Sequence, residues 1–165
     1  MNKKFKQIIG DNMHFEIKQI GIIHSPFKKM EEAPIQPRFS DKPGKIEVFP
    51  EYKEGLKDLE GFSHIILLYY FHLVKEEQLT IRPFMEPDKP KGVFATRYNK
   101  RPNKIGLSIC EIDRIEDNII YVKYIDVLDN TPLIDIKPLV PLFDFRNIEN
   151  IKVGWLSNKK ERPKK

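Results

Sequence analysis

Four cations stand close together in one short segment of the chain. Arg97, Lys100, Arg101 and Lys104 fall within eight residues, and Tyr98 lies among them. A segment that only connects two strands needs to be hydrated, whereas this density of positive charge beside an aromatic ring suits the binding of an anion or a nucleic acid. The alternative is a solvated hairpin tip, and the residues alone leave both interpretations open.

Other polar residues gather where predicted strands end. They lie in three short runs, at 34–37, 71–73 and 129–132. Strand ends of a barrel converge on one rim, so these runs predict a binding site there. Asp135 follows in an otherwise apolar strand, where a carboxylate is costly unless it is exposed or paired. It is therefore a candidate proton acceptor, and the alternative is an ion pair with Lys137.

No metal site is predicted. His64 and His72 share strand parity, but eight strand residues separate them by roughly 26 Å, which one metal ion cannot bridge. The sequence also has no glycine-rich dinucleotide motif, phosphate-binding loop, Cys-x-x-Cys pair or His-Glu-x-x-His motif. These absences argue against a Rossmann-type cofactor site.

Strands dominate the predicted secondary structure. Period-two patterns and short apolar runs predict strands at 15–24, 44–50, 62–72, 93–95, 105–116, 118–128 and 133–138. The spacing of Tyr52, Leu56 and Leu59 predicts a helix over 51–60, and the proline-rich segment 27–43 is a long loop. The fold class is therefore mainly β, a single-domain β-barrel with one or two short helices and long loops.

Length and charge suggest one domain with basic ends. The chain has 165 residues and a net charge of +5; residues 1–11 carry +2 and residues 159–165 carry +4, so the body between them carries −1. We expect a basic N-terminal tail at 1–14, the barrel at 15–145, and a C-terminal extension with a basic tail at 146–165. The tails can attract phosphates, but the high pI does not indicate a basic face on the barrel.

The cellular compartment is predicted from cysteine and hydropathy. The single cysteine, Cys110, lies in an apolar strand pattern and is expected to be a packed, reduced thiol. The longest apolar run, 65–71, is far too short to span a membrane as a helix. We therefore predict a cytoplasmic protein with no membrane contact.

Five ordered motifs resemble one known family. They are Ile-Gly-Ile-Ile-His-Ser-Pro-Phe-Lys at 20–28, Gly-Phe-Ser-His at 61–64, Gly-Val-Phe-Ala-Thr-Arg at 92–97, Arg-Pro-Asn at 101–103 with Ile-Gly-Leu-Ser at 105–108, and Asp-x-Thr-Pro at 129–132 followed by Asp-Ile-Lys-Pro at 135–138. In this order they resemble the TsaA-like family over about 15–143. That family includes β-barrel tRNA methyltransferases, which use S-adenosylmethionine to methylate the exocyclic amine of threonylcarbamoyladenosine beside the anticodon.

The resemblance implies a set of cofactor contacts. Those for S-adenosyl-L-methionine are Pro34, Ile35, Gln36, His72, Leu73, Arg97, Leu107, Asp129, Asn130, Thr131 and Pro132. It also implies a tRNA anticodon loop as partner and a homodimer. The charges of Lys100, Arg101 and Lys104 predict contacts with the RNA phosphates. The chain departs from the family pattern at three positions, with Ile35 for arginine, Lys104 for proline and Asn130 for glycine. The alternatives are an RNA-binding barrel without catalysis and a methyltransferase of the same fold that acts on a small metabolite.

Overall fold

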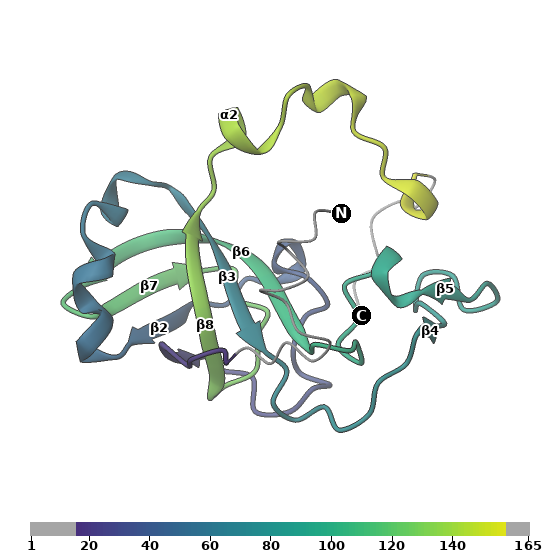
Figure 1. Cartoon of the computed structure of the whole chain (residues 1–165), viewed down its shortest axis with the longest axis horizontal. Coiled ribbons are helices and arrows are strands. Elements are labelled where there is room, and N and C mark those ends of the chain that lie inside the picture. Colours follow the sequence, from purple (N-terminus) through teal and green to yellow (C-terminus); the bar gives the residue numbers. More distant parts are fainter. Residues whose placement is uncertain (1–15, 158–165) are drawn as a thin grey trace, which may run out of the picture.

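The strands of this chain close into a barrel. The computed structural model describes residues 16–157, in which the barrel strands are β1 (Gly21–His24), β2 (Gly44–Val48), β3 (His64–Tyr70), β6 (Ile105–Glu116), β7 (Ile119–Lys123) and β8 (Thr131–Pro138). They pair in the order β1-β2-β7-β6-β3-β8, and every pair is antiparallel (Figure 1). The predicted mainly β, single-domain barrel is confirmed.

The interior of the barrel is filled by alternate residues of its strands. Side chains with no exposed surface come from all six strands, among them Ile23, Ile46, Ile65, Leu67, Cys110, Ile120 and Leu133. Because successive strand residues point to opposite faces, every second residue enters the core. The predicted burial of both faces of β3 is not observed, since its residues alternate between buried and half-buried. Cys110 is packed in the core, as predicted.

The residues just before the cationic segment do not form the predicted strand, so no hairpin frames this segment. Val93–Ala95, predicted as a strand, forms the 3₁₀ turn η4, in which the Thr96 amide and hydroxyl both donate to the Val93 carbonyl at 3.1 and 2.8 Å. These local bonds compete with strand pairing. The strand lies just before, where β5 (Lys91–Gly92) pairs with β4 (Thr80–Ile81) in a small ribbon beside the barrel (Figure 1).

The predicted helix at 51–60 is wrong in type. The segment forms two 3₁₀ elements, η2 (Pro50–Leu56) and η3 (Leu59–Gly61). Asp58 between them has a φ of 64°, which interrupts any α-helix. The buried Leu56 and Leu59 are three residues apart, a spacing that also fits 3₁₀ geometry, so the apolar pattern could not separate the two helix types.

Five of the six barrel strands have a boundary that differs from the prediction, and one of these differences shapes the site. β1 and β8 begin at Gly21 and Thr131 rather than at 15 and 133, and β7 ends at Lys123 rather than at 128. The reason at β7 is Tyr124, whose φ of 64° turns the chain out of the sheet. The residues after Tyr124 therefore leave the barrel wall. Asn130 has a φ of 60°, a left-handed conformation that asparagine tolerates where the family has glycine.

The C-terminal extension arches from the barrel to the ribbon. After β8 come α2 (Pro141–Asp144), η5 (Ile148–Asn150) and η6 (Gly154–Leu156), and Figure 1 shows this segment reaching the side of the molecule that carries β5. There the Trp155 indole donates to the Ala95 carbonyl at 2.9 Å, and Lys91 lies over its ring. The predicted N-terminal tail and residues 158–165 lie outside the described residues. Within 16–157 no helix has the length and hydropathy needed to cross a membrane.

Candidate functional site

A large cavity opens at one end of the barrel. It measures about 950 Å³ and is bounded by the end of β3, the start of β6, the segment after β7 and the start of β8, with the loop after β1 and the 81–99 region as its outer wall. Eight of the predicted cofactor contacts line it: Pro34, Ile35, Gln36, His72, Leu73, Arg97, Leu107 and Thr131. Segments separated by up to about a hundred residues thus meet at one rim, as the sequence predicted.

One side-chain hydrogen bond joins the cationic segment to another part of the cavity lining. Arg97 donates from Nη1 to the Gln36 side-chain oxygen at 2.9 Å, which joins the segment to the proline-rich loop. Both residues line the cavity. A planar guanidinium has five N–H donors, so Arg97 can hold Gln36 and still offer donors to a bound carboxylate or phosphate.

The remaining predicted contacts, Asp129, Asn130 and Pro132, do not line the cavity. Asp129 accepts the Ser25 amide at 3.0 Å and the Lys28 ammonium, and its own amide donates to the Phe27 carbonyl. Burial works to raise the pKa of Asp129, but the bonds from Lys28 and Ser25 outweigh it and the pKa is lowered. This residue ties the 125–130 segment to the chain after β1, and a direct cofactor contact stays a prediction.

A chain of three polar side chains lies at the inner end of the cavity. Ser108 donates from Oγ to Asp126 Oδ1 at 2.5 Å, and the Tyr69 hydroxyl lies 3.0 Å from Ser108 Oγ. Because Ser108 has one proton and gives it to Asp126, the Tyr69 hydroxyl donates to Ser108. Ser108 is fully buried, whereas Tyr69 and Asp126 both line the cavity.

The electrostatics of Asp126 differ from those of a surface carboxylate. Burial raises its pKa from 3.8 to about 6, although the Ser108 hydrogen bond, its own backbone amide and the charge of Arg97 work in the opposite direction. Burial also raises the pKa of Tyr69, so its hydroxyl stays protonated and remains a donor. Burial and the neighbouring Asp126 raise the pKa of the Cys110 thiol to about 12, which makes it unreactive as a thiolate.

Backbone bonds on both sides hold Asp126 in place. Just before it, the Ile125 amide donates to the Lys42 carbonyl at 3.0 Å and the Ile125 carbonyl accepts the Ser40 hydroxyl. After it, Asp129 is tied to the chain after β1 as described above. The segment that carries Asp126 is therefore fixed by two distant parts of the chain.

The sequence did not single out Tyr69, Asp126 and Trp155, which line the cavity, or Ser108, which is bonded to Asp126. Tyr69, Ser108 and Asp126 are hidden in apolar strand patterns, and Trp155 lies in a stretch without pattern. The one available signal was Asp126 itself, a carboxylate inside the run Ile125-Asp126-Val127-Leu128, but the predicted strand to 128 placed it on an ordinary strand face.

Asp135 lies outside the cavity. Its carboxylate accepts the Lys137 ammonium at 2.7 Å and its own neighbouring amide at Ile136, and 40% of its side chain is exposed. The ion pair that was the alternative at the sequence level is present in the structure. A role of Asp135 as proton acceptor has no support from its position.

The three predicted RNA contacts mostly bind their own chain. Lys100 pairs with Glu76 at 3.1 Å, Arg101 donates to the Thr96 carbonyl at 3.3 Å, and Lys104 donates to the Lys75 carbonyl at 3.3 Å. Lys104 also has a φ of 51°, which proline cannot adopt, so the backbone here differs from one with the family's usual proline. These bonds order the segment, and phosphate contacts stay a prediction.

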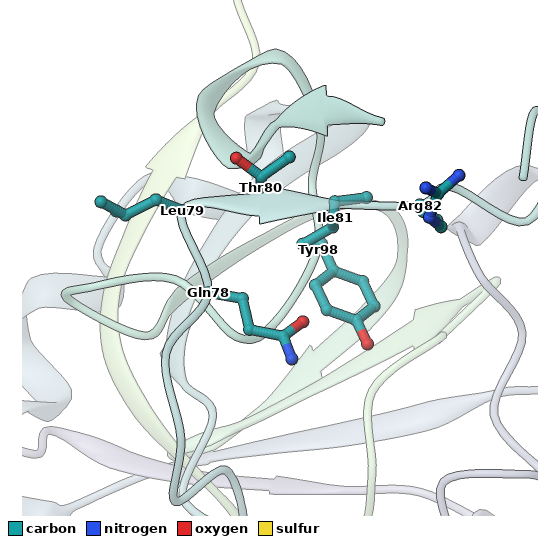
Figure 2. A pocket seen from close by; sticks show the side chains of 6 residues that line it. All are labelled: Gln78, Leu79, Thr80, Ile81, Arg82 and Tyr98. Carbon is teal, nitrogen blue, oxygen red and sulfur yellow. The ribbon is translucent and has the colours of Figure 1, made fainter. Parts of the chain in front are cut away.

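A second, more open pocket lies next to the cavity. It is lined by Gln78, Leu79, Thr80, Ile81, Arg82 and Tyr98, and it shares the last two and Ile81 with the cavity. Figure 2 shows the Gln78 and Tyr98 side chains on the same side of β4, with Arg82 past the end of that strand. Within residues 16–157 no group of three or more histidine, cysteine or acidic side chains is arranged to hold a metal ion.

Comparison with known proteins places the chain in one family. The family model of the tRNA-methyltransferase O N-terminal domain matches residues 22–145. A probable S-adenosyl-L-methionine-binding protein of Pyrococcus abyssi is 53% identical over 138 residues, which cover 83% of this chain and 73% of that protein. A tRNA (adenine(37)-N6)-methyltransferase of Escherichia coli is 36% identical over 137 residues, covering 77% of this chain and 58% of that protein.

A solved structure has the same fold. The crystal structure of TrmO from Pseudomonas aeruginosa superposes with a TM-score of 0.71 at 34% sequence identity, covering 87% of this chain and 63% of that chain. The present chain thus spans about three fifths of the length of these two bacterial relatives.

Proposed function

The chain belongs to the tRNA-methyltransferase O family, and we propose that it transfers a methyl group from S-adenosyl-L-methionine to the exocyclic amine of an adenosine beside the anticodon of tRNA. The observation that carries this proposal is the cavity, which gathers eight predicted cofactor contacts at one rim. Relatives of this chain are named as S-adenosyl-L-methionine-binding proteins and as tRNA (adenine(37)-N6)-methyltransferases. We propose threonylcarbamoyladenosine as the target nucleoside.

The lining of the cavity suits this cofactor in size and chemistry. A volume of about 950 Å³ lies within the range of small-molecule sites, which is about 300–1,000 Å³. Apolar side chains such as Phe71, Leu73 and Leu128 can pack against a purine, and Arg97 can pair with a carboxylate. The side-chain oxygen of Asn99, another lining residue, is buried without a hydrogen-bond partner in the described part of the chain, so an N–H of a bound molecule would satisfy it.

The work left to the protein is positioning. S-adenosyl-L-methionine carries its methyl group on a positively charged sulfur. This sulfur is a good leaving group, so the protein does not need to activate it. Gln36 and Arg97 would hold the cofactor from the outer side of the cavity, and the apolar lining would exclude water. Holding reactants in line is worth about 7–11 kcal/mol in favourable cases. We propose that Lys100, Arg101 and Lys104 order the segment that faces the RNA.

The test is methylation of tRNA in vitro. The full chain is incubated with S-adenosyl-L-methionine and with tRNA from cells that lack the corresponding methyltransferase, and the nucleosides are analysed by mass spectrometry. We expect a mass increase of one methyl group on threonylcarbamoyladenosine only. Binding of the cofactor and of tRNA without methylation would support a non-catalytic RNA-binding barrel, whereas methylation of a small metabolite but not of tRNA would support the other alternative.

We also propose that the protein is a homodimer. The described chain exposes large apolar side chains on α2, where the adjacent Leu142 and Phe143 are each 83% exposed, and in the lining of the cavity, where Phe94 is 76% exposed. Contiguous exposed apolar surface marks a place that a partner covers, and the pair on α2 is the candidate for it. Light scattering on an active preparation should give about twice the monomer mass of 19.5 kDa, and a monomer mass would contradict the proposal.

A further inference from the structure

One carboxylate lies in the cavity, and the reaction needs a proton acceptor. The charged or titratable side chains that line the cavity are Arg38, Tyr69, His72, Arg82, Arg97, Tyr98 and Asp126. Methylation of a neutral amine releases a proton from nitrogen. Arginine cannot accept this proton because its guanidinium is always protonated in proteins, and a neutral tyrosine hydroxyl is a far weaker base than a carboxylate or an imidazole. Among the described residues that line the cavity, Asp126 and His72 are therefore the two side chains able to act as bases.

Position separates these two candidates. His72 is exposed at the outer rim, where water can take a proton without its help. Asp126 lies at the inner end, bonded to the buried Ser108 and held by the anchors on either side. We propose that Asp126 accepts the proton that the target amine loses during methyl transfer, an assignment that rests on the function proposed above.

The proposed step balances in atoms and charge. The nitrogen–carbon bond forms as the carbon–sulfur bond breaks, and the electron pair of the broken bond stays on sulfur. The amine proton moves to the Asp126 carboxylate. A sulfur cation and a carboxylate anion thus become a neutral thioether and a neutral carboxylic acid. An apolar cavity favours this change because it stabilises neutral species relative to charged ones.

The hydrogen-bond chain behind Asp126 suits both protonation states. Before transfer, the Tyr69 and Ser108 hydroxyls point their protons toward the carboxylate, which keeps it ionised despite burial. After transfer, the carboxylic acid can donate to Ser108, and each hydroxyl can reverse its direction because it is both donor and acceptor. The folded-state pKa near 6 also suits a base that must be ionised at neutral pH.

The test compares three aspartate variants of the full chain. Asp126→Asn removes the base with little change of shape, Asp126→Glu keeps a carboxylate, and Asp41→Asn makes the same change at an exposed site whose carboxylate pairs with the neighbouring Lys42. Single-turnover methylation of tRNA is measured at saturating S-adenosyl-L-methionine between pH 5 and pH 8, and the affinity for the cofactor is measured by calorimetry.

We expect Asp126→Asn to lower the single-turnover rate by about 100-fold or more, which is the usual contribution of a general base. Cofactor affinity should stay within about threefold, and the rate should lose its rise with pH. Asp126→Glu should keep that rise, and Asp41→Asn should match the wild type. Ser108→Ala should move the inflection to higher pH, because the Ser108 bond lowers the pKa of Asp126.

Three results would overturn the assignment. An active Asp126→Asn variant would leave the proton to water or to His72. A loss of cofactor affinity with a normal rate at saturation would make Asp126 a binding group instead. A wild-type protein that methylates no tRNA would remove the proposed function, and the role of Asp126 with it. Calorimetry and thermal unfolding show independently whether each variant is folded.

Discussion

The ionisation of Asp126 should make the stability of the protein depend on pH. Because burial raises the folded-state pKa of this carboxyl from 3.8 to about 6, the folded protein binds one more proton than the unfolded chain between about pH 4 and pH 6. The free energy of unfolding therefore falls as the pH rises through this window, and the destabilisation is fully present above it. Asp126→Asn removes the ionisable group and with it this dependence.

The size of the effect follows from the pKa change. Each tenfold change in proton affinity is about 1.4 kcal/mol, so the rise from 3.8 to about 6 destabilises the wild type by about 3 kcal/mol in full. About 2 kcal/mol of this falls between pH 4 and pH 7, because the unfolded carboxyl is already partly ionised at pH 4. The variant should therefore gain about 2 kcal/mol relative to the wild type over this interval. Any constant cost of changing the Ser108 bond cancels in that difference, because it is the same at both pH values.

The assay is urea unfolding followed by circular dichroism at several pH values from 4 to 8, on the wild type, Asp126→Asn and Asp41→Asn. Asp41→Asn is the matched control, because its carboxylate is 85% exposed. Its curve should run parallel to that of the wild type. If the wild-type and Asp126→Asn curves also run parallel, Asp126 titrates as an ordinary carboxylate and the electrostatic description of the cavity is wrong.

Three other predictions concern Arg97 in the cavity lining, Gly106 beneath the Tyr69 ring, and the residues after Ser157. Arg97→Ala removes the bond to Gln36 and should lower the rate of methyl transfer by at least about tenfold, with a melting temperature within a few degrees of the wild type. The rate of Arg97→Lys should lie between those of the wild type and the alanine variant. Full activity of Arg97→Ala would exclude a role of Arg97 in the site. Gly106→Ala places a methyl group 2.1 Å from the Tyr69 ring and should lower the free energy of unfolding by about 1–3 kcal/mol. An unchanged melting temperature would contradict the close packing of Gly106 against Tyr69. Truncation after Ser157 removes five cations. The slope of log tRNA affinity against log salt should flatten by about 0.7–0.9 per lost phosphate contact, and the rate at which bound tRNA is methylated should not change. An unchanged slope would mean that these residues do not contact RNA.

The barrel was predictable because its strands obey one strong rule. Alternation of apolar and polar residues, with β-branched side chains and turn residues between the runs, located all six barrel strands. The two-residue strands β4 and β5 are too short to carry such a pattern. Their pairing depends on distant backbone bonds, such as the one from the Val93 amide to the Leu79 carbonyl.

The inner end of the cavity could not be predicted for a related reason. It depends on the left-handed conformation of Tyr124, which ends β7 five residues before the apolar pattern does. A tyrosine gives no signal for this conformation, since glycine and asparagine are the residues that adopt it readily. A strand to 128 would have placed Asp126 in the barrel wall, where a carboxylate has no access to a ligand.

The motif at 129–132 illustrates how a resemblance can locate a site without assigning the work of each residue. Only Thr131 of this motif lines the cavity, whereas Asp129 bonds to the chain after β1 and Asn130 supplies the left-handed turn into β8. Mutation of Asp129 or of Asn130 would weaken cofactor binding as mutation of a direct contact would, because loss of the turn releases the segment that carries Asp126. A variant that weakens binding through position should also lower the melting temperature, whereas loss of a direct contact should not. Measured together, binding and unfolding of Asp129→Ala therefore separate the two roles, and the bonds of Asp129 lead us to expect that both will fall.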